Sequence, residues 1–295
     1  HEAIEVLKQF KDIKINDGST ISLPDKLKDL YKGLGGTNAD SAIKIQATYS
    51  VFQNEFVGLD FYSATKNDNT YNEVTLAALE AGELMIKDLG YYDGDYFKKI
   101  DNKKAFFLSR IKTNCVLYRM NRSEYEIIDI VKFLKGSENS IDDNVFIKLS
   151  SGTMYEVRLT GLKLPEKVSN ERKRKAYKNA QSNQKQLTEK EIQLLDWFLL
   201  ITNVSDDMLT VKTIGELYRL RWQIELQFKA LKSSMDFDKY GNIGENYFKC
   251  IFYGKLIMVI LTMRLFAICR VIKYKETKRF ISVQKFVRNL RNNTK

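Results

Sequence analysis

Two aspartates, Asp17 and Asp88, lie within or beside apolar stretches of the sequence. Asp17 lies in the middle of an alternating apolar run, and Asp88 closes a second run of the same kind. An ionised carboxylate is not left unpaired in apolar surroundings, so each needs a cation, a metal ion or a bend that exposes it. Carboxylates at the ends of strands often build a Mg²⁺ site, and this is the chemistry we expect from the pair. Two ordinary explanations stay open, because Asp17 before Gly18 fits a hairpin turn and an aspartate that closes a strand is common without any function.

The scarcity of histidine and cysteine limits the kinds of catalytic and metal site that the chain can build. The only histidine is His1, which excludes serine–histidine triads and histidine-ligated zinc. A general acid or base must then be a carboxylate, a lysine, a tyrosine or water. The cysteines have no paired spacing, which argues against a zinc site and a disulfide framework and fits free thiols in a reducing cytoplasm. They are Cys115, Cys250 and Cys269.

Alternation of apolar and polar residues predicts the elements that position the two aspartates. In a strand over residues 13–23 the odd positions share a face, so Asp17 lies in the same apolar row as Ile15. In the run 84–88, Asp88 likewise shares the face of the apolar residues. Further strands are predicted over 43–51, 57–61 and 105–109, with one helix over 72–81. This order of elements is typical of a mixed α/β fold.

Between residues 113 and 186 the pattern changes to short alternating runs broken by glycines, which predicts a mostly β insertion. Its end, residues 163–185, carries eight Lys or Arg against two Glu. This basic segment is either a solvated or disordered loop or a contact for DNA. The whole chain has a formal charge of +11 and a pI near 9.3, which favours a polyanionic partner such as nucleic acid.

A helix is predicted over residues 213–235, with an apolar stripe that should pack on the sheet. The apolar stripe consists of Leu217, Leu220, Ile224, Phe228 and Leu231. A second stripe, whose members fall within about 60° of one another around the helix axis, consists of Tyr218, Arg221, Glu225 and Lys232. By itself, this second stripe also fits an ordinary exposed row of salt bridges.

One apolar stretch, residues 251–268, raises the question of a membrane span. Lys255 and Arg264 interrupt it, and each is costly at a bilayer centre, so we expect a core or interface helix instead. The chain shows no signal peptide and begins without methionine. We therefore expect a piece of a longer protein.

The charged stripe has the spacing of a known signature. Tyr218-x2-Arg221-x3-Glu225-x6-Lys232 resembles the Y-R-E-K signature of bacterial insertion-sequence DDE transposases of the insertion sequence 4 type. Asp17-Gly-Ser-Thr and Asp88-Leu-Gly-Tyr-Tyr resemble the two aspartate motifs of that family, and Phe106-Phe-Leu-Ser-Arg110 resembles the strand after the second motif. Together these motifs span most of the chain.

The resemblance implies an α/β, ribonuclease-H-like (retroviral-integrase-like) fold with a mixed sheet. It implies Asp17 on the first strand, Asp88 on the fourth, and Glu225 on a helix after the mostly β insertion. The expected parts are a catalytic domain in two stretches, 1–112 and 187–236, the insertion at 113–186, and a helical, basic C-terminal region at 237–295.

The resemblance also implies the roles of individual residues. Asp17, Asp88 and Glu225 would ligate two Mg²⁺ or Mn²⁺ ions, of which one activates the attacking oxygen and the other stabilises the leaving oxygen. Tyr218, Arg221 and Lys232 would contact phosphates of the transposon end. Arg110 is a further candidate for these phosphates, or a plain surface arginine. Trp197 is a hypothesis for stacking on a flipped base, and its position beside the apolar run 198–201 fits core packing equally well.

The function that follows from the resemblance is DNA cleavage and strand transfer at transposon ends in the bacterial cytoplasm, with nucleoid association on DNA. The expected partners are double-stranded DNA and a second copy of the chain in a synaptic complex, with the apolar helix 248–268 as interface. Two rival functions remain: a catalytically inactive DNA-binding remnant, and a hydrolytic nuclease of the same fold.

Overall fold

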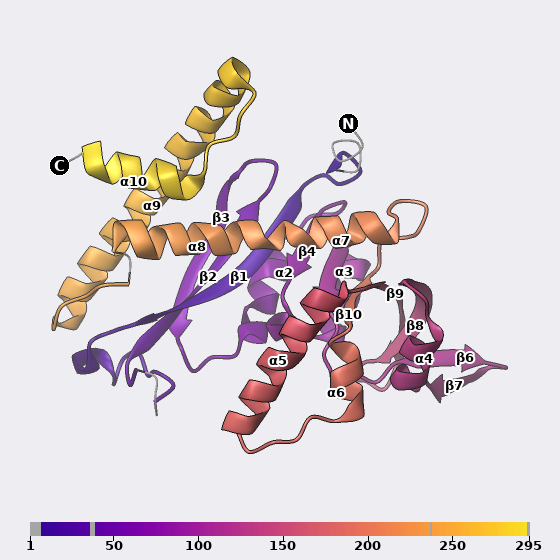
Figure 1. Cartoon of the computed structure of the whole chain (residues 1–295). Helices are drawn as coiled ribbons and strands as arrows, with labels where there is room; N and C mark the ends of the chain where they lie inside the picture. Colours follow the sequence, from indigo (N-terminus) through magenta and orange to yellow (C-terminus); the bar gives the residue numbers. More distant parts are fainter. Residues whose placement is uncertain (1–6, 36–38, 237, 294–295) are drawn as a thin grey trace. The chain divides into compact units, whose positions relative to one another are not determined.

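The computed structural model describes residues 7–35, 39–236 and 238–293 (Figure 1). The chain divides into two compact units, each built from two separate stretches of sequence. Unit 1 comprises residues 1–11 and 76–219, and unit 2 comprises residues 12–75 and 220–295. The four-part division expected from the sequence cuts the chain at other positions and stays a prediction.

Unit 2 contains an antiparallel sheet of three consecutive strands, in the order β3-β2-β1. The strands are β1 (Ile13–Ser22), β2 (Ala42–Ser50) and β3 (Glu55–Ser63). The predicted strand is confirmed as β1, where Ile13 and Ile15 are fully buried, but burial does not alternate at its start because Asn16 is buried as well. Asp17 pairs with Ala47 of β2 in the middle of the strand, so the alternative of an Asp-Gly hairpin turn at this position is wrong.

Helix α8 (Arg221–Met235) packs on β1, as the apolar stripe predicts, because Ile224 and Phe228 are buried. The side chain of Leu231, a further member of that stripe, lies outside the described residues. Two shorter elements, η1 (Asp25–Leu27) and η2 (Asp68–Tyr71), flank the strands. The predicted helix 72–81 forms as the shorter α2 (Asn72–Ala77).

Helix α9 (Glu245–Thr277) packs on the edge strand β3, and α10 (Val283–Asn293) follows α9 in the chain. The rings of Phe61 and Phe252 meet edge-on with centroids 4.8 Å apart. The expectation of a core or interface helix is confirmed on the core side by the burial of Phe248 and Phe252. Among the described residues, no helix is long and apolar enough to cross a membrane.

Unit 1 contains a second set of strands in the order β4-β5-β10-β9-β8-β6-β7. Among the described strand pairs of this unit only β4–β5 is parallel, and the chain passes from β4 to β5 through helix α3 (Gly94–Asn102). The strands are β4 (Leu84–Lys87), β5 (Phe106–Arg110), β6 (Tyr118–Asn121), β7 (Glu124–Ile127), β8 (Ser140–Lys148), β9 (Met154–Lys163) and β10 (Trp197–Thr202). Their core includes Phe97 and Phe107, which stack with ring centroids 4.4 Å apart.

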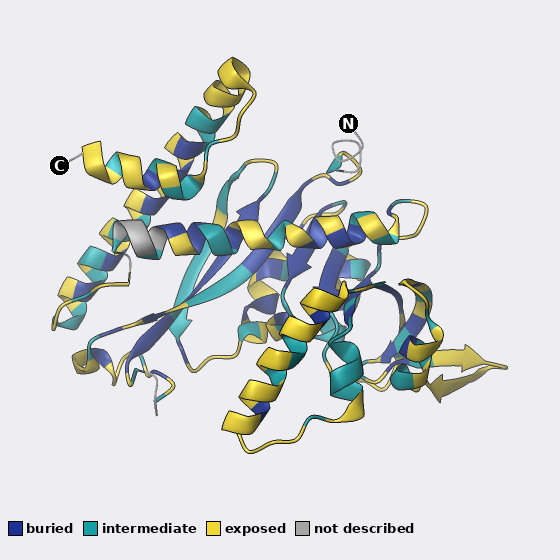
Figure 2. Cartoon of the chain, viewed as in Figure 1, coloured by how far each residue is buried: buried dark blue, intermediate teal, exposed yellow. Residues whose placement is uncertain are grey.

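The helices of unit 1 correct two predictions. Helix α3 (Gly94–Asn102) occupies a stretch where no helix was expected, and Asp93 caps it by accepting from the amides of Asp95 and Tyr96. Helix α5 (Glu166–Ser182) replaces the expected basic loop, because this stretch holds no glycine and no internal proline to end a helix. Figure 2 shows that most of α5 is exposed. The insertion therefore adds two helices, α4 (Ile130–Gly136) and α5, to its predicted strands.

The predicted helix 213–235 is interrupted once. Helix α7 (Val211–Arg219) is the last element of unit 1, the second stretch of unit 2 begins at Leu220, and α8 begins at Arg221. The amide of Gln223 donates to the carbonyl of Leu220 at 2.9 Å, so a tighter turn replaces regular α-helical bonding at the start of α8. The short helix α6 (Glu189–Leu194) precedes β10.

Candidate active site

Unit 2 brings Asp17 and Glu225 to one guanidinium group. Arg221 Nη1 lies 3.3 Å from Asp17 Oδ2, and Arg221 Nη2 lies 2.6 Å from Glu225 Oε1. The side chains of Arg221 and Asp17 are 14% and 15% exposed, and that of Glu225 is 34% exposed. Two acids that are far apart in the sequence thus share one partly buried cation, which offsets the repulsion between their charges.

The local sequence explains why these three side chains meet. Asp17 occupies an odd position of β1, so it points to the face that Ile13 and Ile15 present to α8. Arg221 and Glu225 are four residues apart on α8 and therefore lie on one side of that helix. The burial of Ile224 fixes the rotation of α8 about its axis.

Lys232 binds the same strand farther along α8. Its Nζ donates to the carbonyl oxygen of Thr20 at 2.7 Å. Burial lowers the pKa of Lys232 from its ordinary value, and Asp238 opposes that shift by attracting the charged form. The Arg, Glu and Lys of the charged stripe therefore all lie along one face of α8, next to β1.

In unit 1, Asp88 directly follows β4, where its backbone leads into the short helix η3 (Leu89–Tyr91). One oxygen of its carboxylate accepts a hydrogen bond from the hydroxyl of Tyr218 at 3.1 Å. Tyr218 is only 5% exposed and packs edge-on against Phe198. The hydroxyl of Tyr218 thus orients this carboxylate.

The acids fit a hard divalent cation by type, since Mg²⁺ and Mn²⁺ prefer carboxylate oxygens. Within the described residues no three acidic, cysteine or histidine side chains are grouped closely enough to hold a metal ion. Unit 2 supplies two carboxylates, Asp17 and Glu225, at the guanidinium of Arg221. Unit 1 supplies Asp88.

The other two candidates have different surroundings. Arg110, at the end of β5, is partly exposed and lies near Arg172 of α5, whose pKa is lowered by burial and by the charge of Arg110. Trp197 is 2% exposed and belongs to the core of unit 1, so the structure favours core packing over base stacking. Its indole N–H has no hydrogen-bond partner among the described residues.

Sequence reasoning missed the part that α5 plays in building this side of unit 1. Arg172 Nη1 donates to the carbonyl of Trp197 at 3.3 Å, and Lys173 pairs with Asp196 at 2.6 Å. Both contacts attach the basic helix to the start of β10. The available signal was the run from Glu166 to Ser182, which lacks helix-breaking residues and follows Pro165.

Comparisons with known proteins identify the family of the chain. The chain is 30% identical over 270 residues to the transposase for insertion sequence element IS1151 of Clostridium perfringens, covering 86% of this chain and 56% of the relative. It is 30% identical over 294 residues to the transposase for insertion sequence element IS231E of Bacillus thuringiensis subsp. finitimus, covering 94% of this chain and 61% of that protein. The chain thus spans less than two thirds of the length of these relatives.

A solved structure shares the fold. It is the cryo-EM structure of the piggyBac transposase synaptic complex with hairpin DNA, with a TM-score of 0.51 and 10% identity, covering 95% of this chain and 51% of that one. The mixed α/β architecture is ribonuclease-H-like, as expected from the sequence. The family model described as the transposase DDE domain matches residues 8–261, and the chain therefore belongs to the transposase DDE domain family.

Proposed function

We propose that this chain is the catalytic part of a DNA transposase that cuts DNA at transposon ends and joins the freed ends to a target. The observation that carries the proposal is the meeting of Asp17 and Glu225 at Arg221. These are two acids of the predicted triad and the arginine of the signature helix. Family membership supplies the reaction class.

Asp17, Asp88 and Glu225 are the proposed ligands of Mg²⁺ or Mn²⁺. Tyr218 and Arg221, which contact Asp88 and the other two acids respectively, are three positions apart in the chain. The assignment of the three acids to one site rests on the resemblance of their motifs to those of the family. Two bound ions would supply Lewis-acid activation of the attacking oxygen and stabilisation of the leaving oxygen.

The protein's own side chains prepare that site. Arg221 offsets the negative charges of Asp17 and Glu225, so the two carboxylates can be held together before a metal ion binds. Tyr218 fixes the orientation of the Asp88 carboxylate. The packing of Ile224 on the sheet holds the helix that carries Arg221 and Glu225.

Double-stranded DNA is the proposed substrate, in keeping with the charge of +11. Arg221 and Lys232 on unit 2 are proposed phosphate contacts, and Tyr218 and Arg110 on unit 1 are two more. The exposed cations of α5, among them Arg174, Lys175 and Lys178, extend this set. Because Trp197 is buried, a base-stacking role for it is not part of the proposal.

A homodimer in the synaptic complex is also proposed, with α9 as the interface and action at the bacterial nucleoid. One side of α9 packs on β3 through Phe248 and Phe252. Its other side exposes large apolar residues: Ile257, Leu261, Leu265 and Ile268 are 58%, 57%, 43% and 57% exposed. Contiguous exposed apolar surface on one helix supports an interaction surface.

The test is metal-dependent nicking of a labelled duplex that carries a candidate transposon end. Wild type is compared with Glu225→Gln, and with Glu216→Gln on an exposed position of α7 as matched control. DNA binding is measured in parallel, and joining to a supercoiled plasmid is scored separately. The proposal predicts that Glu225→Gln loses cleavage and keeps binding, while Glu216→Gln cleaves like wild type.

The rival functions give different results in the same assay. Binding without cleavage by the wild type would favour the DNA-binding remnant. Cleavage without any joined product would favour a hydrolytic nuclease. Equal cleavage by wild type and Glu225→Gln would overturn the assignment of Glu225.

A further inference from the structure

The junction between α9 and α10, defined as residues 270–291, is the most basic part of unit 2 outside the charged stripe. It contains eight cations and one acid, Glu276. The cations are Arg270, Lys273, Lys275, Lys278, Arg279, Lys285, Arg288 and Arg291. Among the described residues, ion pairs in this junction join Lys273 to Glu276 and Arg291 to Asp236.

An exposed aromatic ring lies at the centre of these cations. Phe280 is 66% exposed and stacks on Tyr274 with ring centroids 4.6 Å apart and an angle of 13° between the planes. The guanidinium of Arg270 lies 4.9 Å from the centre of the same ring. Arg270 and Tyr274 are one turn apart on α9, and the side chain of Phe280 stays largely exposed although both residues contact its ring.

The chain and its contacts hold the ring in this position. Lys278 ends α9 in the left-handed region with φ 57°, and its amide donates to the carbonyl of Tyr274 at 2.9 Å, which turns the chain back over the helix. Arg270 Nη1 donates to Asn54 Oδ1 at 3.1 Å, in the turn between β2 and β3. These contacts hold the ring of Phe280 in place against Tyr274 and Arg270.

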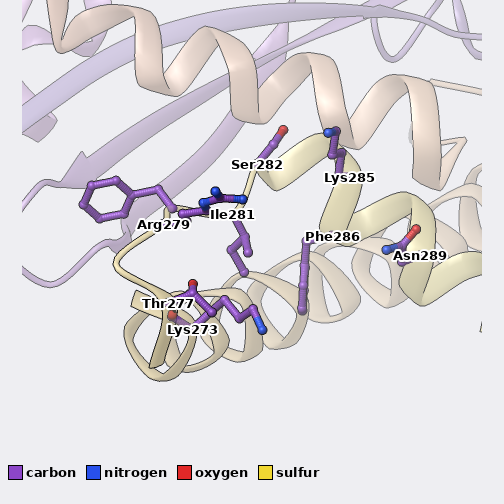
Figure 3. Close-up of a pocket in the computed structure, with 9 residues that line it drawn as sticks. Lys273, Thr277, Arg279, Ile281, Ser282, Lys285, Phe286 and Asn289 are labelled. Atoms are coloured by element: carbon purple, nitrogen blue, oxygen red, sulfur yellow. Dashed lines mark hydrogen bonds between the residues drawn. The ribbon is translucent and has the colours of Figure 1, made fainter. Parts of the chain in front are cut away.

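Two hollows lie beside Phe280, which lines both of them. The first has a volume of about 700 Å³, and Figure 3 shows its lining side chains arranged around it from the end of α9, the connecting segment and α10. Lys273, Arg279 and Lys285 are among them. The second has a volume of about 820 Å³ and is lined by Arg270, Lys275 and Lys278 together with residues 51–54.

We propose that this junction binds a DNA strand with accessible bases, with one base stacked on Phe280 and phosphates held by the cations around it. A flat exposed ring beside a row of cations is the combination by which proteins hold single nucleic acid strands. A second copy of the same surface would bring like charges together, so charge complementarity favours an anionic partner. The inference rests on the proposed function for the presence of DNA, and not on Asp17, Asp88 or Glu225.

The first experiment measures binding of the full chain to a single-stranded oligonucleotide that contains 2-aminopurine, in EDTA. Anisotropy gives the affinity, and quenching of 2-aminopurine fluorescence reports stacking. Phe280→Leu keeps an apolar side chain and removes the ring. It should lower affinity between about 5-fold and about 100-fold and abolish the quenching, as loss of one base–aromatic stack predicts. Tyr125→Leu, at a 42% exposed position on β7 of unit 1, is the matched control and should bind like wild type.

The second experiment tests the cations through the salt dependence of binding. Lys275→Gln with Lys278→Gln should lower the slope of log affinity against log salt by about 0.7 for each phosphate that these lysines no longer neutralise. Lys132→Gln on α4, a position with an 87% exposed side chain, should leave the slope unchanged. Circular dichroism and thermal unfolding of each variant confirm that it is folded.

The outcomes separate this inference from the proposed function. Glu225→Gln should bind and quench like wild type, because the strand site does not use that carboxylate. If the wild type does not cleave DNA but quenches 2-aminopurine, and Phe280→Leu does not quench it, the inference is upheld and the proposed function is overturned. Unchanged affinity and quenching in Phe280→Leu would overturn the inference alone. A change of oligomeric state in Phe280→Leu with unchanged DNA binding would also overturn it, by identifying a self-association surface.

Discussion

The acids of the two units have partners of different charge. In unit 2, Asp17 and Glu225 share the guanidinium of Arg221, whereas in unit 1 Asp88 accepts a hydrogen bond from the neutral hydroxyl of Tyr218. A cation lowers the free energy of two like charges held together, while a phenol mainly fixes the direction of a carboxylate. Asp17 and Glu225 thus have a cation that offsets their mutual repulsion, and Asp88 has a hydroxyl that fixes the direction of its carboxylate.

The largest effect is expected where a proposed metal ligand itself is removed. Asp17→Asn keeps the shape of the side chain and should lower cleavage by roughly a thousandfold, because lost metal-ion stabilisation amounts to several kcal/mol. Nicking rates of the labelled duplex at saturating Mg²⁺ measure it. Asp143→Asn, an exposed aspartate of β8 paired with Arg119, serves as the matched control and should keep full activity. Similar cleavage rates for Asp17→Asn, Asp143→Asn and wild type would show that Asp17 is not needed for catalysis.

The second largest effect is expected when the hydroxyl that orients Asp88 is removed. Tyr218→Phe removes the hydroxyl that contacts Asp88 and keeps the ring that packs on Phe198. Cleavage should fall by about 10- to 100-fold, as for other groups that orient a metal ligand. The apparent Mg²⁺ requirement should rise with it, which a purely structural role would not produce. Titration of cleavage against Mg²⁺ concentration measures both.

The charged partner should show its effect in stability. Arg221→Gln leaves Asp17 and Glu225 close together without their shared cation, and should cost about 1–2 kcal/mol of unfolding free energy in EDTA. Excess Mg²⁺ should reduce this difference if it takes over the charge balance. Urea unfolding with and without Mg²⁺ measures the change. Arg119→Gln, which breaks an exposed pair with Asp143, should cost less than about 0.5 kcal/mol in either condition. Equal costs for the two arginines would contradict the special role of Arg221.

The smallest effect concerns pH and Lys232. Burial depresses the pKa of Lys232 below its ordinary 10.5, so the unfolded chain binds this proton more tightly than the folded one. The cost of charging Lys232 in the folded state then disappears as the pH rises toward 10.5, and unfolding free energy increases over that window. Wild type should therefore gain stability relative to Lys232→Met between pH 8 and pH 10 in urea titrations. A constant difference across this range would show that the contact with Thr20 fully offsets the burial.

Periodicity predicted the elements that carry the acids, because alternation and helical spacing report which side of an element is buried. Asp17 on β1, Asp88 after β4 and Glu225 on α8 were all expected from such patterns together with the family resemblance. The burial of Ile224 and Phe228 follows from the same spacing. Local patterns are sufficient where one face of an element packs on a core.

The missed features depend on contacts between distant parts of the sequence. The helix α5 is stabilised by Lys173 at Asp196 and Arg172 at the carbonyl of Trp197, which no local pattern reports. The interruption of the signature helix at Leu220 also has no sequence signal, since the residue is neither glycine nor proline. Only the burial of Trp197 in the structure decides between base stacking and core packing for this residue. Only the fold shows that Arg221 is the partner of Asp17.

The most direct test of the central claim is the affinity of the full chain for Mn²⁺, followed by electron paramagnetic resonance in wild type, Asp88→Asn and Glu225→Gln. Each substitution is expected to weaken Mn²⁺ binding at least about tenfold, because Asp88 and Glu225 are both proposed ligands of the metal ion. Weakened binding in Glu225→Gln with wild-type affinity in Asp88→Asn would contradict the proposal that Asp88 is a ligand of the metal ion.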